Sequence, residues 1–330
     1  MRAVWLRKFG GPEVLEAGEA PDPVAGPGQV LVDVELVNIT FVETQFRATG
    51  GGPFAGSLPM IPGNGVGGVI AAVGDGVAAD LVGVRVVTST GGSGAYAERV
   101  AVPADTVFPV PDGLALDTAV ALLADGRTAT MMTRAARLVP GDRVLVEAAA
   151  GGVGSLLVQL AIAAGARVIA AVGGGGEHHG EPDDIGARKV AVAESLGAEV
   201  VVDYRDAGWP RLVRDAVGEV DVVFDGVGGD VALAAFGLLG RGGRMVSFGL
   251  ASGAWAPVAE DDAAARGIAL VRPSATAAEL REYTVSALAA AADGRLRPLI
   301  GQRFPLDRAA DAHAAIQSRA TVGKTLLEAK

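Results

Sequence analysis

One segment, residues 143–154, constrains the fold of this chain more than any other. A short apolar run, Arg143–Glu147, gives way to small residues and glycines, and an uncharged run with helical spacing, Ser155–Gly165, follows at once. This order predicts a strand, a tight turn and a helix. Because glycine has no Cβ atom, its N–H group can approach a pyrophosphate at the start of a helix. The spacing differs from the usual G-x-G-x-x-G, and a tight turn that holds no ligand is the alternative. The three glycines are Gly151, Gly152 and Gly154.

Strands and helices alternate through the segment that follows residue 118. We predict six strands with mainly helical connections, which is the pattern of a doubly wound parallel sheet in an α/β protein. The predicted strands are Arg143–Glu147, Arg167–Val172, Glu199–Asp203, Val220–Asp225, Arg244–Phe248 and Ile268–Val271.

Residues 1–118, in contrast, carry the pattern of β-structure. Val30–Val37, Val66–Val73 and Val84–Thr88 are rich in valine, and glycine and proline separate them. We expect a barrel-like β domain with long loops. The tail predicts a helix over 276–293, a strand near Leu299–Phe304, a helix over Asp307–Arg319 and a last strand at Lys324–Leu327.

The composition narrows the classes of partner and of chemistry. The chain has 330 residues, a formal net charge of −10 and a pI of about 4.9. Such a charge disfavours nucleic acids and anionic membranes as partners. Because the chain has no cysteine, disulfides, thiolate metal sites and a cysteine nucleophile are excluded.

An uncharged stretch over residues 148–166 is almost long enough to cross a membrane. Its glycines cluster at the predicted turn, and Glu147 and Arg167 bound it closely, so a buried helix of the α/β unit explains it better. The N-terminus lacks the apolar stretch of a secretory signal. We therefore expect no membrane partner and a cytoplasmic location.

Short motifs along nearly the whole chain carry a family resemblance. They are Gly10–Leu15, Pro62-Gly63 ahead of Gly68, Gly94–Glu98, Thr128-Ala129, Ala149–Gly154, Leu196–Ala198, Asp203-Tyr204, Asp221–Gly229, Gly242–Gly249, Val271–Ser274 and Val322–Lys324. In this order they resemble the medium-chain dehydrogenase/reductase superfamily, in its zinc-free quinone oxidoreductase (zeta-crystallin-like) branch.

The resemblance implies a fold and an activity. It implies a GroES-like catalytic domain, residues 1–118 plus 274–330, and an NADPH-binding Rossmann domain, residues 119–273. It also implies a cytosolic homodimer that binds a small quinone or enone between the two domains.

The end of the second predicted strand bears on the choice of nicotinamide cofactor. A fold that prefers NAD usually has an acid there, and Ile169–Gly174 has none. By resemblance, Lys189 contacts the 2′-phosphate of NADPH and Tyr204 lines the same pocket; a solvated surface cation is the alternative for Lys189. An insertion, residues 175–186, brings acids near this pocket, and we expect adventitious metal binding at most from His178 and His179.

The resemblance also assigns the remaining cofactor contacts. Thr128 is expected near the nicotinamide, the glycine turn at the pyrophosphate, and the segment after the fifth strand beneath the nicotinamide ribose. Arg272 and Lys324 are expected to close the site, with a surface role as the alternative. The full set is Thr128, Gly151, Gly152, Val153, Gly154, Gly174, Lys189, Tyr204, Phe248, Gly249, Leu250, Arg272 and Lys324.

The expected chemistry is hydride transfer to a conjugated acceptor without a metal. Relatives carry an Asn, an acid and an Arg where this chain has Thr40, Glu43 and Arg47; a local ion pair between Glu43 and Arg47 is the alternative, because their spacing is i,i+4. Asn64 is a further donor for substrate, unless it serves the turn. Phe54 stands near a position that is often Tyr and cannot donate a proton, so solvent or Thr40 would supply it.

Two other functions stay open. One is an enoyl-thioester reductase of polyketide or lipid synthesis. We rank it lower, because its substrate would arrive on an acidic carrier protein, which an acidic chain does not readily attract. The other is an NADPH-binding protein without enzymatic activity. His313, the remaining histidine, is expected to be a packed or surface residue rather than a catalyst.

Overall fold

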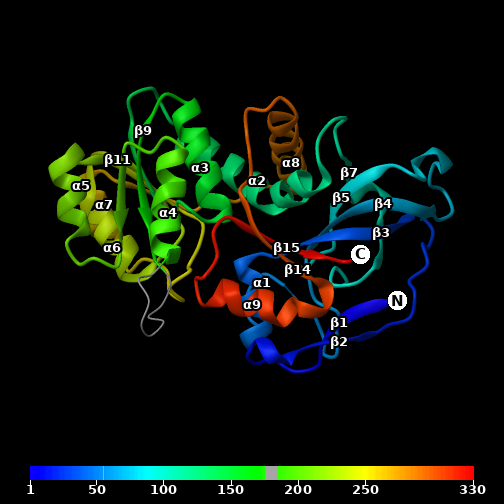
Figure 1. Cartoon of the computed structure of the whole chain (residues 1–330). Helices are drawn as coiled ribbons and strands as arrows, with labels where there is room; N and C mark the ends of the chain where they lie inside the picture. Colours follow the sequence, from blue (N-terminus) through cyan, green and yellow to red (C-terminus); the bar gives the residue numbers. More distant parts are fainter. Residues whose placement is uncertain (55, 175–183) are drawn as a thin grey trace. The chain divides into compact units, whose positions relative to one another are not determined.

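The computed structural model describes residues 1–54, 56–174 and 184–330 (Figure 1). The chain divides into two compact units, Met1–Ala124 with Ala287–Lys330, and Asp125–Ser286. The chain passes from one unit to the other inside helices α2 (Leu116–Ala136) and α8 (Ala277–Ala292). The prediction put these boundaries at residues 118/119 and 273/274.

The unit Asp125–Ser286 contains the parallel sheet that the sequence predicts. Its strand order is β10-β9-β8-β11-β12-β13, and every neighbouring pair is parallel. The order reverses between β8 and β11, and ligands of open α/β sheets bind at such a point, outside the carboxyl ends of the strands. The strands are β8 (Arg143–Glu147), β9 (Arg167–Val172), β10 (Val200–Asp203), β11 (Val220–Asp225), β12 (Leu239–Ser247) and β13 (Ala269–Val271).

Helices cover this sheet in two groups. One group contacts β8, β9 and β10, the other contacts β10 to β13, and Figure 1 shows the strands between them. Leu145, Ile169 and Val223 are fully buried in the core, as central parallel strands require. The first group is α3 (Gly152–Ala163) and α4 (Asp184–Ser195), and the second is α5 (Trp209–Val217), α6 (Gly229–Leu238) and α7 (Glu260–Arg266).

The other unit is built on a seven-stranded sheet of order β14-β15-β3-β4-β5-β7, with β6 paired to β3, and a separate hairpin of β1 and β2. The pairs are antiparallel except β14 with β15. Val30, Val32 and Val34 of β3 are fully buried, so alternate residues of this strand face the core. The strands are β1 (Arg2–Leu6), β2 (Leu15–Glu19), β3 (Gln29–Asn38), β4 (Gly65–Val73), β5 (Arg85–Ser89), β6 (Arg99–Pro103), β7 (Val107–Pro109), β14 (Ile300–Pro305) and β15 (Lys324–Glu328).

Two helices of this unit, α1 (Phe41–Thr49) and α9 (Ala309–Gln317), contact each other although they are far apart in sequence (Figure 1). Helix α1 begins after Thr40, whose Thr-x-x-Glu pattern forms a capping box, and ends at Gly50, which adopts φ 72°. Short 3-10 turns are η1 (Pro12–Val14), η2 (Ala79–Leu81), η3 (Ala104–Thr106) and η4 (Leu306–Arg308).

Two predicted elements begin three or more residues earlier than expected. Helix α3 begins at Gly152 rather than Ser155, because the glycines form its first turn instead of a separate loop. Strand β12 runs over Leu239–Ser247 rather than Arg244–Phe248, since its glycine-rich start still adopts extended backbone. In the part of the chain that the structure describes, no helix combines the length and the apolarity needed to cross a bilayer.

Candidate functional site

The glycine turn leaves no room for side chains where it joins β8 to α3. Gly151 is the N-cap of α3, and its N–H group donates to Ala148 O at 2.8 Å. A Cβ atom on Gly154 would lie 2.2 Å from the same carbonyl oxygen, so only glycine fits there. Ala148 itself adopts φ 49°, a left-handed conformation that costs a non-glycine residue about 1–3 kcal/mol and that clusters at functional sites. The start of α3 therefore presents bare backbone N–H groups and the positive end of a helix dipole.

A second group gathers at the carboxyl end of β9. Lys189 of α4 is buried, and its Nζ donates to Gly173 O at 2.8 Å. A Cβ atom on Gly173 would lie 2.3 Å from the hydroxyl oxygen of Tyr204, and one on Gly174 would meet the guanidinium of Arg205. The structure thus brings Lys189, Gly174 and Tyr204 together, as the sequence predicts.

Arg205 is a member of this group that the sequence reasoning missed. Its guanidinium binds the Asp203 carboxylate, with Nη2 2.7 Å from Oδ2. Although partial burial works against it, hydrogen bonds and the charge of Arg205 lower the pKa of Asp203. The Asp-Tyr pair followed directly by an arginine was the available signal, because a side chain two residues after an acid can reach back to it.

The segment after β12 packs on the turn that follows β11. The Phe248 N–H group donates to Asp225 O at 2.9 Å, and a Cβ atom on Gly249 would lie 2.6 Å from Gly226 O. Leu250 follows directly. Arg272, beyond β13, lies over the ring of Trp255 with 5.2 Å between its guanidinium carbon and the ring centroid. Thr128 is half-buried on α2.

Two buried acids, also missed from the sequence, lie where the strand order reverses. Glu147 ends β8 and Asp225 ends β11, and both are fully buried. Glu147 Oε2 accepts from the Val227 N–H group at 3.0 Å, and Asp225 Oδ1 accepts from the Gly228 N–H group at 2.8 Å. Burial, together with the charge of Asp225, raises the pKa of Glu147 well above its usual range.

In the β-rich unit, three of the four predicted acceptor-side residues meet at one carboxyl group. Glu43 Oε2 accepts from the N–H group of Thr40 at 2.6 Å and from its hydroxyl at 2.7 Å. Glu43 Oε1 accepts from the Asn64 N–H group at 3.1 Å. Ser89 donates its hydroxyl to Asn64 Oδ1 at 3.0 Å, which orients that amide. Lys324, buried at the start of β15, bears on Glu43 electrostatically.

Arg47, the fourth residue, does not join this group. The predicted alternative, an ion pair with Glu43, was also wrong: among the described residues these two side chains form none, because Glu43 reaches back to the helix start. Arg47 is 1% exposed and instead donates through Nη2 to Gln317 Oε1 of α9 at 2.8 Å.

Tyr96 and His313 lie near Arg47. The Tyr96 hydroxyl and His313 Nε2 lie 2.7 Å apart, and both side chains are buried. Burial, aided by the charge of Arg47, lowers the pKa of His313 to about 3, so the ring is neutral. His313 is thus a packed histidine. Phe54, which stands near a position that is often Tyr, packs edge to face on Phe46 with 5.9 Å between the ring centroids.

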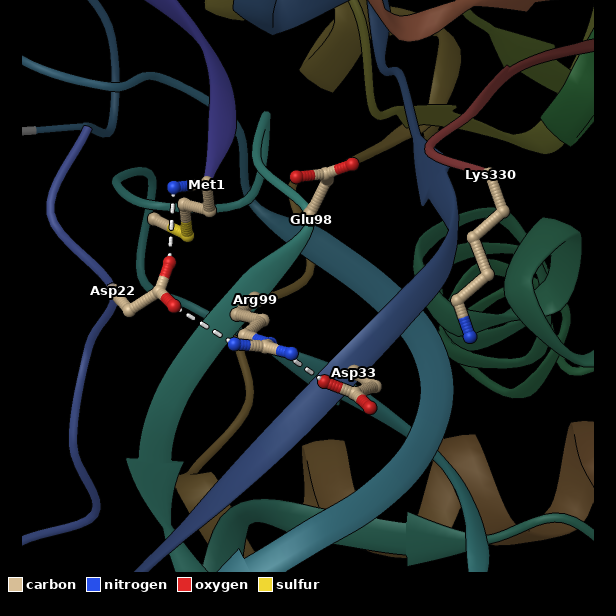
Figure 2. Close-up of a pocket in the computed structure, with 6 residues that line it drawn as sticks. All are labelled: Met1, Asp22, Asp33, Glu98, Arg99 and Lys330. Carbon is tan, nitrogen blue, oxygen red and sulfur yellow. Dashed lines mark hydrogen bonds and ion pairs between the residues drawn. The ribbon is translucent and has the colours of Figure 1, made fainter. Parts of the chain in front are cut away.

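A shallow hollow of about 280 Å³ on the β-rich unit contains none of the predicted residues (Figure 2). Arg99 bridges Asp22 and Asp33 at 2.8 and 2.9 Å, and the N-terminal amine of Met1 lies 2.9 Å from Asp22. These charges pair with one another, and the N-terminal amine is one of them. The hollow is lined by Met1, Asp22, Asp33, Glu98, Arg99 and Lys330.

In the described ranges, no three His, Asp or Glu side chains come close enough together to hold a metal ion. His178 and His179 lie outside those ranges, as do Glu177, Glu181 and Asp183 of the insertion.

Known proteins share both halves of this architecture. Residues 26–112 match the alcohol dehydrogenase GroES-like domain, and residues 196–327 match the zinc-binding dehydrogenase family. A probable quinone oxidoreductase of Schizosaccharomyces pombe is 37% identical over 98% of this chain and 96% of its own length. A 2-haloacrylate reductase of a Burkholderia species is 31% identical over 98% of both. The structure of Escherichia coli quinone oxidoreductase complexed with NADPH is 32% identical, covers 99% of this chain and all of its own, and superposes with a TM-score of 0.87. The chain therefore belongs to the medium-chain dehydrogenase/reductase superfamily, in its zinc-free quinone oxidoreductase branch.

Proposed function

We propose that this protein is an NADPH-dependent reductase that transfers hydride to quinones or α,β-unsaturated carbonyls without a metal. The observation that carries the proposal is the basic, side-chain-poor cradle at the carboxyl ends of β8 and β9. Lys189 and Arg205 supply positive charge there, and the turn up to Gly154 supplies N–H groups. Relatives and neighbours named as quinone oxidoreductases, one of them complexed with NADPH, support it.

The residues fit this cofactor. The start of α3, over Gly151 to Gly154, would hold the pyrophosphate, because three of its four residues have no Cβ atom and the helix N-terminus favours an anion. Lys189 and Tyr204, with Gly174 beside them, would bind the 2′-phosphate. Phe248, Gly249, Leu250 and Thr128 would seat the ribose and nicotinamide, and Arg272 and Lys324 would bind at the periphery.

When bound, the reduced nicotinamide supplies a hydride. The residues of the chain then have to position the acceptor, exclude water and stabilise the developing negative charge on the acceptor oxygen. Thr40 and Asn64 are half-buried polar residues that could donate hydrogen bonds to that oxygen. Glu43 holds both in place, because it accepts from the Thr40 hydroxyl and from the Asn64 N–H group. Arg47 would act through packing, since its contact with Gln317 ties α1 to α9.

Conjugated acceptors suit such a site because conjugation spreads the incoming charge over carbon and oxygen. The chain has no cysteine, the usual ligand of zinc in dehydrogenases with a structural or catalytic zinc. A relative named 2-haloacrylate reductase agrees with a conjugated double bond as the acceptor.

The test is NADPH oxidation by the purified protein against a panel of ortho-quinones, para-quinones and enones, repeated with NADH. We expect turnover of at least one class with a preference for NADPH. Calorimetry with each nucleotide is run in parallel. Tight NADPH binding without turnover would favour a non-enzymatic role, and no binding of either nucleotide would overturn the proposal.

We also propose a cytoplasmic homodimer. Strand β13 is the last strand in the order of its sheet, and Leu270 at its centre is 40% exposed. An uncapped, apolar edge strand favours pairing with a second copy of the same strand about a twofold axis.

A further inference from the structure

Glu43 is a buried acid with two hydroxyls beside it, those of Thr40 and Tyr96. Glu43 is 4% exposed, whereas Thr40, which is hydrogen-bonded to it, is half-buried and so reaches solvent more than the acid does. The 2.7 Å contact joins Thr40 Oγ1 to Glu43 Oε2. Because both partners are oxygens, a proton on either one can occupy this hydrogen bond.

The same motif stands at a second helix start in the chain, in a different environment. Thr276 and Glu279 at the start of α8 repeat the Thr-x-x-Glu pattern, with both Thr276 N and Thr276 Oγ1 2.8 Å from Glu279 Oε2. That pair is exposed, and its hydrogen bonds lower the pKa of Glu279. Burial raises the pKa of Glu43, although its bonds to Thr40 oppose the shift. Helix capping thus accounts for the motif but not for its burial at α1.

We propose that Glu43 is the proton source of the reduction and that Thr40 passes its proton to the acceptor oxygen. The inference rests on the proposed function, because it needs an acceptor whose oxygen gains negative charge beside Thr40.

The step balances as a two-proton shift. Hydride addition reduces the acceptor by two electrons and leaves a negative oxygen. The Oγ1–H bond of Thr40 breaks as an O–H bond forms on the acceptor, and the Oε2–H bond of Glu43 breaks as Thr40 regains its proton. Glu43 is then a carboxylate, held by the N–H groups of Thr40 and Asn64, and it takes a proton from solvent through Thr40 before the next turnover.

Other groups around Glu43 are less suited to this task. Tyr96 is also hydrogen-bonded to Glu43, but it is fully buried and its hydroxyl lies 2.7 Å from His313 Nε2. Burial, with the charge and the hydrogen bond of Glu43, raises the pKa of Tyr96 well above its usual range, so it holds its proton. Lys324 on β15 opposes protonation of Glu43 through its charge. Arg47, on α1 itself, bonds to Gln317 and does not titrate near neutrality.

The first test compares Glu43→Gln with Glu279→Gln. Both changes keep an acceptor for the threonine N–H group, but only the first removes the proposed acid. A positioned general acid contributes about 10²–10⁴-fold to rate, so we expect kcat with an enone to fall at least about 10²-fold in Glu43→Gln, with unchanged NADPH affinity. Glu279→Gln should stay within about twofold, since its side chain is exposed and in neither proposed site.

The pH dependence separates catalysis from a structural role. Because protonated Glu43 is the active form, kcat of the wild type should fall as the pH rises through the pKa of Glu43. The residual rate of Glu43→Gln should lack that transition. A second readout needs no turnover: the infrared difference spectrum of wild type minus Glu43→Gln should contain a protonated carboxyl band that disappears over the same pH range.

A second pair of variants decides the matter if Glu43→Gln fails to fold. Thr40→Val should lower kcat as far as Glu43→Gln, and Thr40→Ser should restore it. An active wild type with equal kcat in Glu43→Gln or Thr40→Val would overturn the relay alone. A wild type that reduces no quinone or enone would overturn the proposed function instead, and the infrared band would then still report whether Glu43 holds a proton.

Discussion

Replacing Lys189 with methionine should remove most of the preference of the protein for NADPH over NADH. Lys189 is buried on α4, and its Nζ donates a hydrogen bond to Gly173 O at 2.8 Å. A hydrogen bond to a charged group is worth about 1.5–3 kcal/mol, and 1.4 kcal/mol is a factor of ten in affinity, so the loss for NADPH should be about 10- to 150-fold. NADH, which lacks the 2′-phosphate, should lose less than about threefold.

The assay is a calorimetric titration of wild type and variant with each nucleotide at fixed ionic strength. Arg188→Ala is the matched control, because Arg188 is the neighbouring cation on the same helix but is exposed. It should change the affinity for NADPH less than about threefold, as expected for a screened surface charge. Equal losses for NADH and NADPH in Lys189→Met would refute the assignment, since a local distortion would then explain the effect.

Three further predictions test the glycine turn, the buried histidine and the dimer. Gly154→Ala should destabilise the protein by about 1–3 kcal/mol, because its new Cβ atom would collide with Ala148 O. Gly237→Ala, on a helix with open space around the position, should stabilise the protein by about 0.5–1 kcal/mol. Thermal unfolding measures both changes, and unchanged stability in Gly154→Ala would contradict the tight packing of the turn. His313 has a folded-state pKa of about 3 and an unfolded-state pKa of about 6.5. It should therefore lower the free energy of unfolding by about 1.4 kcal/mol per pH unit as the pH falls from about 6.5 towards about 3, with no effect above about 6.5. Urea unfolding should show that His313→Gln lacks this slope, and an unchanged slope would count against a neutral buried ring. Leu270→Lys should convert the proposed dimer to monomer in sedimentation experiments, and a dimeric variant would exclude β13 as the interface.

The order of elements could be predicted from the sequence because local patterns determine it. The continuous apolar runs of β8 and β9 and the glycine turn before α3 each carry a signal within ten residues or so. By resemblance, Lys189 and Tyr204 were expected to line one pocket, and the structure brings both to the glycines at the end of β9.

The contacts of the acceptor-side residues could not be predicted in the same way. The spacing of Glu43 and Arg47 favours a helical ion pair, but a partner 270 residues away, Gln317, binds the arginine instead. The Thr-x-x-Glu motifs at the starts of α1 and α8 look alike in sequence, yet burial raises the pKa of Glu43 whereas hydrogen bonds lower the pKa of the exposed Glu279. Burial depends on which elements pack over a residue, and spacing along the chain does not encode that.

The buried acids Glu147 and Asp225 lie close to the turn that we propose for the pyrophosphate, so their charge bears on cofactor binding. Two carboxylates at the carboxyl ends of β8 and β11 would oppose the pyrophosphate that we propose for the adjoining turn. The structure reduces this repulsion in two ways. The raised pKa of Glu147 favours its neutral form, and the Gly228 N–H group binds Asp225 from the loop that also supports Phe248. The raised pKa of Glu147 thus lowers the negative charge beside the turn, which helps an acidic protein to hold a polyanionic cofactor there.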